Sequence, residues 1–247
     1  SIAGKAYARL APIKNIVKRV ILLGPCHRVA VQGMALPSSN AFATPLGIIP
    51  IDETLRKQAL NFPQVEIFDP THENEHSLEV HLPFLQRTLD EFTLLPFVVG
   101  QIGPDSVAEV LAQLWGGRET LIVVSSDLSH YLDYNKARKI DAKTSLAIEK
   151  LAPDEISREG ACGRFPIAGL LVAASARGMT VQTLDLRNSG DTAGKKDKVV
   201  GYGSWLFFER TKHSNIGDPD KIQMGGQKGS KKLAPYIDPR SEERRVG

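Results

Sequence analysis

Short runs of Val, Ile and Leu that alternate with segments of helical periodicity most constrain what this chain can fold into. Each of these runs is typical of a strand covered on both faces of a sheet. They span residues 17–23, 94–99 and 121–124. Helical segments are predicted at 107–115, 137–151 and 166–178, and later strands at 180–184 and 199–208. The alternation predicts a single-domain α/β fold, residues 1–210, whose central sheet is largely parallel or mixed with helices on both faces.

The segment 75–89, EHSLEVHLPFLQRTL, predicts a further helix. Its leucines at positions 78, 82, 85 and 89 recur at helical spacing and form one buried stripe. On this helix Glu75 and His81 flank the stripe, so both are candidate pocket residues that support a metal ligand. A solvated charged face is the alternative interpretation. Pro83 predicts a kink or a break.

Charge argues against a nucleic-acid partner. The formal net charge of the chain is +3, and residues 211–247 account for it with eight Lys or Arg and five Asp or Glu. The remaining body is neutral, so it offers no basic face to a phosphate backbone. We interpret 211–247 as a disordered extension because it is polar and has no apolar period. Its last eight residues, Arg240 to Gly247, resemble a translated sequencing adapter.

Neither a membrane span nor a secretory signal is predicted. No apolar run reaches the roughly 18 residues of a transmembrane helix, and the first residues, SIAGKAYARL, lack the order of a signal peptide. We therefore expect a cytoplasmic protein. Two cysteines are too few for a disulfide framework, so reduced thiols are expected.

Titratable residues follow two of the predicted strands. His27 comes after the strand 17–23, while Asp127 and His130 come after the strand 121–124. In an open α/β sheet, functional groups gather beyond the carboxyl ends of the strands. His130 is suited to acid or base catalysis because imidazole titrates near neutrality. Asp127 is either a catalytic partner or a helix N-cap.

The two cysteines are candidate site residues as well, because Cys26 directly precedes His27 and Cys162 lies just before a predicted helix. Cys162 precedes a very apolar helix, whose positive end would favour the thiolate that a metal binds. The alternative is a small core cysteine, and the same alternative holds for Cys26 beside His27. As a pair, His27 and Cys162 are ligands suited to Fe, Zn or Cu rather than to Mg or Ca.

Five ordered motifs resemble one known family. LLGPCH, ENEHSLEVHLPFLQ, VVSSDLSHY, ACGRFPIAGLL and LRNSGDT with VVGYGS resemble, in order and spacing, the Memo family, known in prokaryotes as AmmeMemoRadiSam system protein B. The resemblance covers residues 1–209. It implies a fold similar to that of the class III extradiol dioxygenases, which are non-haem Fe(II) enzymes.

The resemblance also implies a metal site. Its ligands would be His27, Cys162 and a histidine of an upstream HAGY motif, which this chain lacks because it begins just after that motif; we therefore expect an N-terminally truncated sequence. Fe(II) is the expected metal, with Cu and Zn as alternatives. His130 would be the acid or base and Asp127 its orienting partner. Cys26 stands where the family usually has Ser, so we expect it to add a thiol to the pocket beside His27.

The function expected from these features is that of a non-haem, iron-type redox or dioxygenase-like enzyme. The resemblance further implies a radical SAM protein and an AMMECR-type protein as partners, and a small-molecule substrate. A metal-binding interaction protein that keeps the fold without turnover is the alternative. A hydrolase that uses Ser125 or Cys26 is disfavoured because the chain has no G-x-S-x-G elbow.

Overall fold

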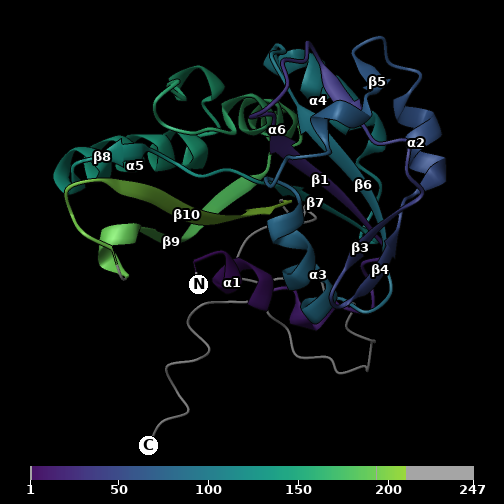
Figure 1. The fold of residues 1–247 in the computed structure, drawn as a ribbon, viewed down its shortest axis with the longest axis horizontal. Coiled ribbons are helices and arrows are strands. Elements are labelled where there is room, and N and C mark those ends of the chain that lie inside the picture. Colours follow the sequence, from purple (N-terminus) through teal and green to yellow (C-terminus); the bar gives the residue numbers. More distant parts are fainter. Residues whose placement is uncertain (1, 193, 210–247) are drawn as a thin grey trace, which may run out of the picture. The chain divides into compact units, whose positions relative to one another are not determined.

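The central sheet has five strands of mixed direction. In the computed structural model, which describes residues 2–192 and 194–209, the strand order is β5-β2-β6-β1-β7 (Figure 1). The strands are β1 (Arg19–Pro25), β2 (Met34–Leu36), β5 (Val65–Ile67), β6 (Thr93–Val99) and β7 (Thr120–Val124). β1 lies parallel to β6 and β7, whereas β2 is antiparallel to β6 and parallel to β5. The predicted mixed α/β architecture is confirmed.

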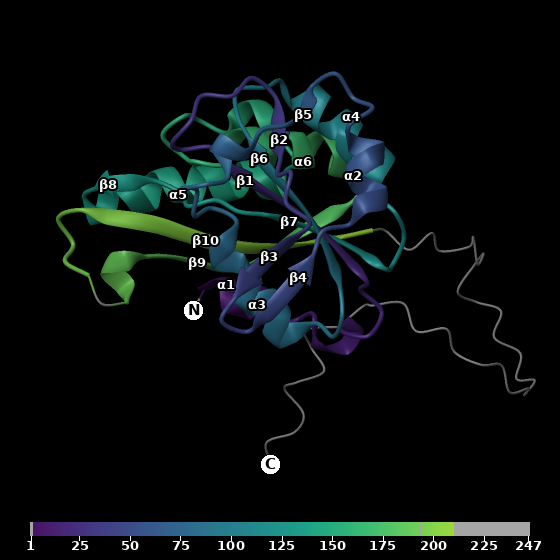
Figure 2. The same cartoon turned by 45° about the vertical axis from the view of Figure 1, so that its right-hand side comes forward.

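Helices cover both faces of this sheet, as the continuous apolar runs predict. On one face the core includes residues of α2 (Glu53–Ala59), α4 (Pro104–Leu114) and α6 (Arg164–Ala176). The opposite core includes Tyr7 of α1 (Ile2–Ala8) and leucines of α3 (Leu82–Thr88). Figure 2 shows α1 and α3 side by side. The β1 side chains at positions 20–23 alternate between the two cores and are fully buried.

The late strands form a second sheet. β8 (His130–Leu132), β9 (Thr180–Asn188) and β10 (Val199–Phe208) pair antiparallel in the order β8-β10-β9, beside α5 (Tyr134–Glu149). Figure 1 shows β9 and β10 as a long ribbon that extends away from the central sheet. A two-stranded hairpin, β3 (Ala41–Thr44) and β4 (Gly47–Pro50), completes the strands.

The helix predicted over 75–89 is wrong in its extent. A 3-10 turn spans Glu79–His81, and α3 begins only at Leu82. Pro83 lies in the first turn of α3, where its missing N–H costs no hydrogen bond, so it starts the helix instead of kinking it. The four leucines are nevertheless all buried, because the turn keeps Leu78 over the same core as the helix.

Residues Ser1–Glu209 group into one compact unit. The extension predicted at 211–247, with its adapter-like end at 240–247, lies outside the described residues. None of the helices within 2–192 or 194–209 combines the length and apolar character that crossing a membrane requires.

Candidate metal and acid-base site

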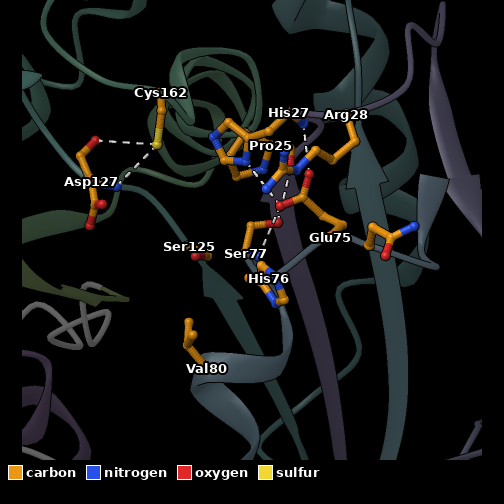
Figure 3. A pocket seen from close by; sticks show the side chains of 11 residues that line it. Pro25, His27, Arg28, Glu75, His76, Ser77, Val80, Ser125, Asp127 and Cys162 are labelled. Atoms are coloured by element: carbon orange, nitrogen blue, oxygen red, sulfur yellow. Dashed lines mark hydrogen bonds and ion pairs between the residues drawn. The ribbon is translucent and has the colours of Figure 1, made fainter.

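The carboxyl ends of β1 and β7 meet at one edge of the central sheet. Leu23 is paired with Val124, and the backbone N–H of Ser125 continues the ladder by donating to the Leu23 carbonyl at 2.7 Å. The chain segments that follow both strands border a pocket of about 520 Å³ (Figure 3). Its lining residues are Pro25, His27, Arg28, Asn74, Glu75, His76, Ser77, Val80, Ser125, Asp127 and Cys162. The structure thus brings His27, Glu75, Asp127 and Cys162 together.

The orientation of His27 is fixed by Glu75. The Glu75 carboxylate accepts the backbone N–H of His27 at 2.6 Å and the Nδ1–H of its imidazole at 2.9 Å. Because a carboxylate only accepts hydrogen bonds, Nδ1 carries the proton, and Nε2 is left with a free lone pair. In Figure 3 that second ring nitrogen lies on the side of the ring turned away from Glu75 and toward Cys162.

Glu75 is ionised at neutral pH. Burial alone would raise the pKa of its carboxyl, but the hydrogen bonds from the His27 imidazole, the His27 backbone and the Ser77 backbone lower it below the usual value. Its side chain is only 3% exposed. A buried, charged acceptor of this kind fixes the tautomer and the ring orientation of the imidazole it holds, as is usual for metal-ligating histidines.

A glycine in β1 lets the Glu75 segment approach. A Cβ built on Gly24 would lie 2.7 Å from Ser77 Oγ and 2.8 Å from a Leu78 methyl carbon, closer than real contacts allow. The Ser77 hydroxyl then donates to the carbonyl of Pro25 at 2.9 Å. The absence of a side chain at Gly24 therefore allows the segment that contains Glu75, 51 positions later, to bring its carboxylate into contact with His27.

Hydrogen bonds with Asp127, which follows β7, hold Cys162 at the end of this strand. The backbone N–H of Asp127 donates to Cys162 Sγ at 3.2 Å, and the thiol donates to the Asp127 carbonyl at 3.6 Å (Figure 3). The backbone N–H of Cys162 donates to the same carbonyl at 3.2 Å. The next residue, Gly163, donates its N–H to the Ser126 hydroxyl at 2.9 Å. This mutual bonding fixes the thiol where it faces the pocket.

The thiolate predicted for Cys162 is not favoured in the described structure. Burial raises the pKa of the Cys162 thiol, and the hydrogen bonds from Ser126 and the Asp127 backbone offset this only in part. The helix that follows was expected to favour the thiolate, but loss of hydration outweighs it. A cation bound in the pocket would reverse this balance, since a coordinating thiol loses its proton.

Asp127 and His130 lie near each other at the margin of the pocket. His130 Nε2 is 3.7 Å from Asp127 Oδ2, beyond direct hydrogen bonding. Burial raises the pKa of the Asp127 carboxyl, while His130 and His27 counteract the rise. Asp127 lines the pocket, whereas His130, the first residue of β8 and the partner of Val200 in β10, does not.

Two further candidate residues lie outside the pocket lining. The Cys26 thiol donates to the Val29 carbonyl at 2.7 Å and packs against the core on the α1 and α3 face. The His81 imidazole shares a 2.7 Å hydrogen bond with the Tyr7 hydroxyl. His81 therefore joins α1 to the turn before α3, and the prediction that it forms the pocket wall is not met. The His81 prediction rested on a continuous helix over 75–89, whereas His81 lies in the 3-10 turn Glu79–His81.

Both predicted metal ligands of this chain, His27 and Cys162, line the pocket. Within residues 2–192 and 194–209, no three His, Cys, Asp or Glu side chains are grouped so that they could hold a metal ion. The pocket also contains Arg28, Asn74, His76 and Ser77, which the sequence reasoning did not select. The ENEHS segment that contains three of them was the available signal, but only the contact with His27 shows which of its residues face the pocket.

Sequence comparison decides the family. The family description "Memo-like protein" matches residues 1–206. The chain belongs to the Memo family. One relative, a MEMO1 family protein of Aquifex aeolicus, is 34% identical over 217 residues, which is 83% of this chain and 81% of that protein. A MEMO1 family protein of Methanosarcina acetivorans is 36% identical over 215 residues, or 82% of this chain and 80% of the relative.

A solved structure supports the fold of this Memo-family chain. The crystal structure of an uncharacterized protein, JW3007 of Escherichia coli K12, superposes with a TM-score of 0.50 at 10% sequence identity. The similarity covers 82% of this chain and 93% of the other. At that identity the similarity concerns the fold alone.

Proposed function

We propose that this Memo-family chain is a metal-binding protein whose pocket acts as a non-haem, iron-type redox or dioxygenase-like centre. The observation that carries the proposal is the orientation of His27 by Glu75, which leaves Nε2 free in a pocket also lined by Cys162. An imidazole held by a carboxylate through its other nitrogen is the usual arrangement of a metal-ligating histidine.

The donor types fit a transition metal. Imidazole nitrogen and thiolate sulfur suit Fe, Zn and Cu, whereas Mg and Ca prefer oxygen. In this proposal His27 Nε2 and Cys162 Sγ are two ligands, and the third is the upstream histidine that the resemblance implies. A bound Fe(II), or Cu or Zn in its place, would supply Lewis-acid or redox chemistry.

The proposed proton transfer uses Asp127 and His130. Asp127 lines the pocket, and its oxygen is 3.7 Å from His130 Nε2, so a small movement or one water molecule connects them. His130 would accept or return a proton of the bound small molecule, while Asp127 orients its ring. Neither side chain is needed as a ligand in this assignment.

Metal analysis tests the ligand assignment. We expect the chain extended by a segment with a His-Ala-Gly-Tyr motif to bind about one metal ion, and the unextended chain to bind far less, because affinity gathers from all ligands at once. In the extended chain, His27→Ala and Cys162→Ala should each remove the metal, whereas His76→Ala, an exposed pocket residue, should not. Full occupancy in both ligand variants would overturn the assignment.

A measurement of substrate turnover distinguishes the enzymatic proposal from the alternative, a metal-binding interaction protein. Oxygen uptake with catechol-type substrates, measured on the iron-loaded extended chain, would support the enzymatic proposal. Stoichiometric metal without oxygen consumption for any such substrate would favour the interaction protein. Association with a radical SAM protein and an AMMECR-type protein belongs to the same proposal, and co-purification of the three proteins would test it.

A further inference from the structure

The structure contains a second pocket, which shares no lining residue with the candidate metal pocket. It has a volume of about 500 Å³ and is bordered by the starts of α4 and α6 and by the 3-10 turn Pro153–Glu155. Its lining residues are Gln32, Gln101, Ile102, Gly103, Pro104, Pro153, Asp154, Ile156, Arg164, Phe165 and Ala168. No part of the proposed function uses this pocket.

Arg164 is the unexplained charge in this second pocket. Its guanidinium carbon lies 4.2 Å from the centre of the Phe165 ring, which holds the side chain by a cation-π contact. Within the described ranges the guanidinium makes no hydrogen bond and no ion pair, although the residue is partly buried. Its five N–H donors have no acceptor among the described residues, so the guanidinium is available to an acceptor on a ligand.

The rest of the second pocket is apolar below and polar at its rim. Ile156 is buried, and Ile102 and Phe165 are partly buried, so these three provide an apolar surface. The amides of Gln32 and Gln101 are exposed. The carboxylate of Asp154 is also exposed, and it makes no ion pair with Arg164 in the described chain. Such a surface suits a ligand with an apolar body and one charged end.

We propose that this second pocket is a binding site for a small organic carboxylate. The carboxylate pairs with the Arg164 fork through two parallel N–H···O bonds, the geometry for which guanidinium is preferred over ammonium. The apolar body of the ligand lies on Ile102, Ile156 and Phe165. The site is separate from the metal proposal, and it exists whether or not His27 and Cys162 bind a metal.

Benzoate is a suitable probe because it combines a carboxylate with a flat apolar ring. We expect saturable binding to the full chain in the presence of EDTA, which removes any contribution from a metal. In a methyl NMR titration, the signals of Ile102 and Ile156 should shift, whereas that of Ile48, exposed on the β3–β4 hairpin, should not. Neutral benzamide should bind at least about tenfold more weakly, since it lacks the charge that Arg164 pairs with.

Substitution of individual arginines tests whether benzoate binds at Arg164. Arg164→Ala should weaken benzoate binding by about tenfold or more, and Arg164→Lys should recover only part of it. Arg28→Ala is the matched control, because Arg28 lines the metal pocket and likewise makes no ion pair in the described residues. Unchanged affinity in both Arg164 variants, equal binding of benzamide, or loss of binding in Arg28→Ala alone would overturn the proposal. A thermal melt of each variant confirms that the comparison is between folded proteins.

Discussion

Glu75 accepts both the backbone N–H and the imidazole N–H of His27, at 2.6 and 2.9 Å. Two bonds from one residue to one carboxylate fix the ring plane as well as the main chain. The His27 side chain itself remains 46% exposed, so its orientation comes from this contact and not from close packing. The position of the free Nε2 therefore depends on a residue 48 positions away in the sequence.

Replacing Glu75 should weaken metal binding without removing a ligand. In the chain extended by the upstream histidine, we expect Glu75→Gln to lower metal affinity about 10 to 100-fold, because the amide holds the imidazole less firmly and without charge. Competition with a chromogenic chelator measures the change. Glu79→Gln is the control, since the Glu79 carboxylate bonds to the exposed His76, and it should leave the affinity unchanged. Equal affinities for both variants would contradict the positioning role.

Gly163 should tolerate no side chain. A Cβ there would lie 2.6 Å from the Ser125 carbonyl oxygen and 2.7 Å from Ser126 Cβ, so Gly163→Ala must push the Cys162 turn away from β7. We expect a loss of about 1–3 kcal/mol in the free energy of unfolding, measured by urea denaturation. Gly103→Ala is matched, because nothing lies within 4 Å of its added methyl group. A neutral Gly163→Ala would mean that the turn is not tightly packed.

The Tyr7–His81 pair should make stability depend on pH. Burial lowers the pKa of His81 to about 4, whereas an unfolded histidine titrates near 6.5. Above pH 6.5 the imidazole is neutral in both states. As the pH falls below 6.5 only the unfolded chain gains the proton, so stability is lost, by about 3 kcal/mol once pH 4 is reached.

A His81→Gln variant isolates this effect. The free energy of unfolding of the wild-type chain, measured between pH 7 and pH 4, should fall more steeply than that of His81→Gln. Replacing the exposed His76 by Gln should leave the wild-type slope in place. Parallel curves for the wild type and His81→Gln would show that His81 is not kept neutral.

His130 should matter for turnover and not for metal content. If the iron-loaded, extended chain consumes oxygen with a substrate, we expect His130→Ala to reduce kcat by about 100-fold or more, the usual contribution of a general acid or base. Metal content, measured by mass spectrometry, should remain at the wild-type level. Loss of metal in this variant would place His130 among the ligands instead.

The sequence was sufficient for the strands β1, β6 and β7 because apolar side chains on both of their faces contact the cores, buried along most of β1 and β6 and partly buried in the edge strand β7. β1, β6 and β7 appear as continuous apolar runs, and a run of this kind has few other solutions in an α/β fold. The leucines at 78, 82, 85 and 89 mark buried positions equally well, but a turn followed by a helix satisfies the same spacing. Periodicity therefore indicated which residues are buried, and the backbone at 75–81 was assigned incorrectly.

The candidate site was predictable only in part, since His27, Glu75, Asp127 and Cys162 line the pocket but Cys26, His81 and His130 do not, and the contacts between these residues could not be predicted. His27 and Asp127 could be located because both follow strands of one sheet. The contact of Glu75 with His27, and that of Cys162 with the Asp127 backbone, join segments far apart in the sequence. Such contacts depend on side-chain size at Gly24 and Gly163, where only the folded chain shows what a methyl group would meet.

The register between β1 and β7 determines how His27 and Asp127 are placed relative to each other. Leu23 stands opposite Val124, and His27 and Asp127 follow these two residues by four and three positions. A slip of one residue would displace one strand end by about 3.3 Å and turn its side chains to the opposite face. That displacement exceeds a metal–ligand bond of about 2 Å. Mutations in the apolar interior of these strands can therefore change the relative positions of His27 and Asp127 without replacing any polar residue.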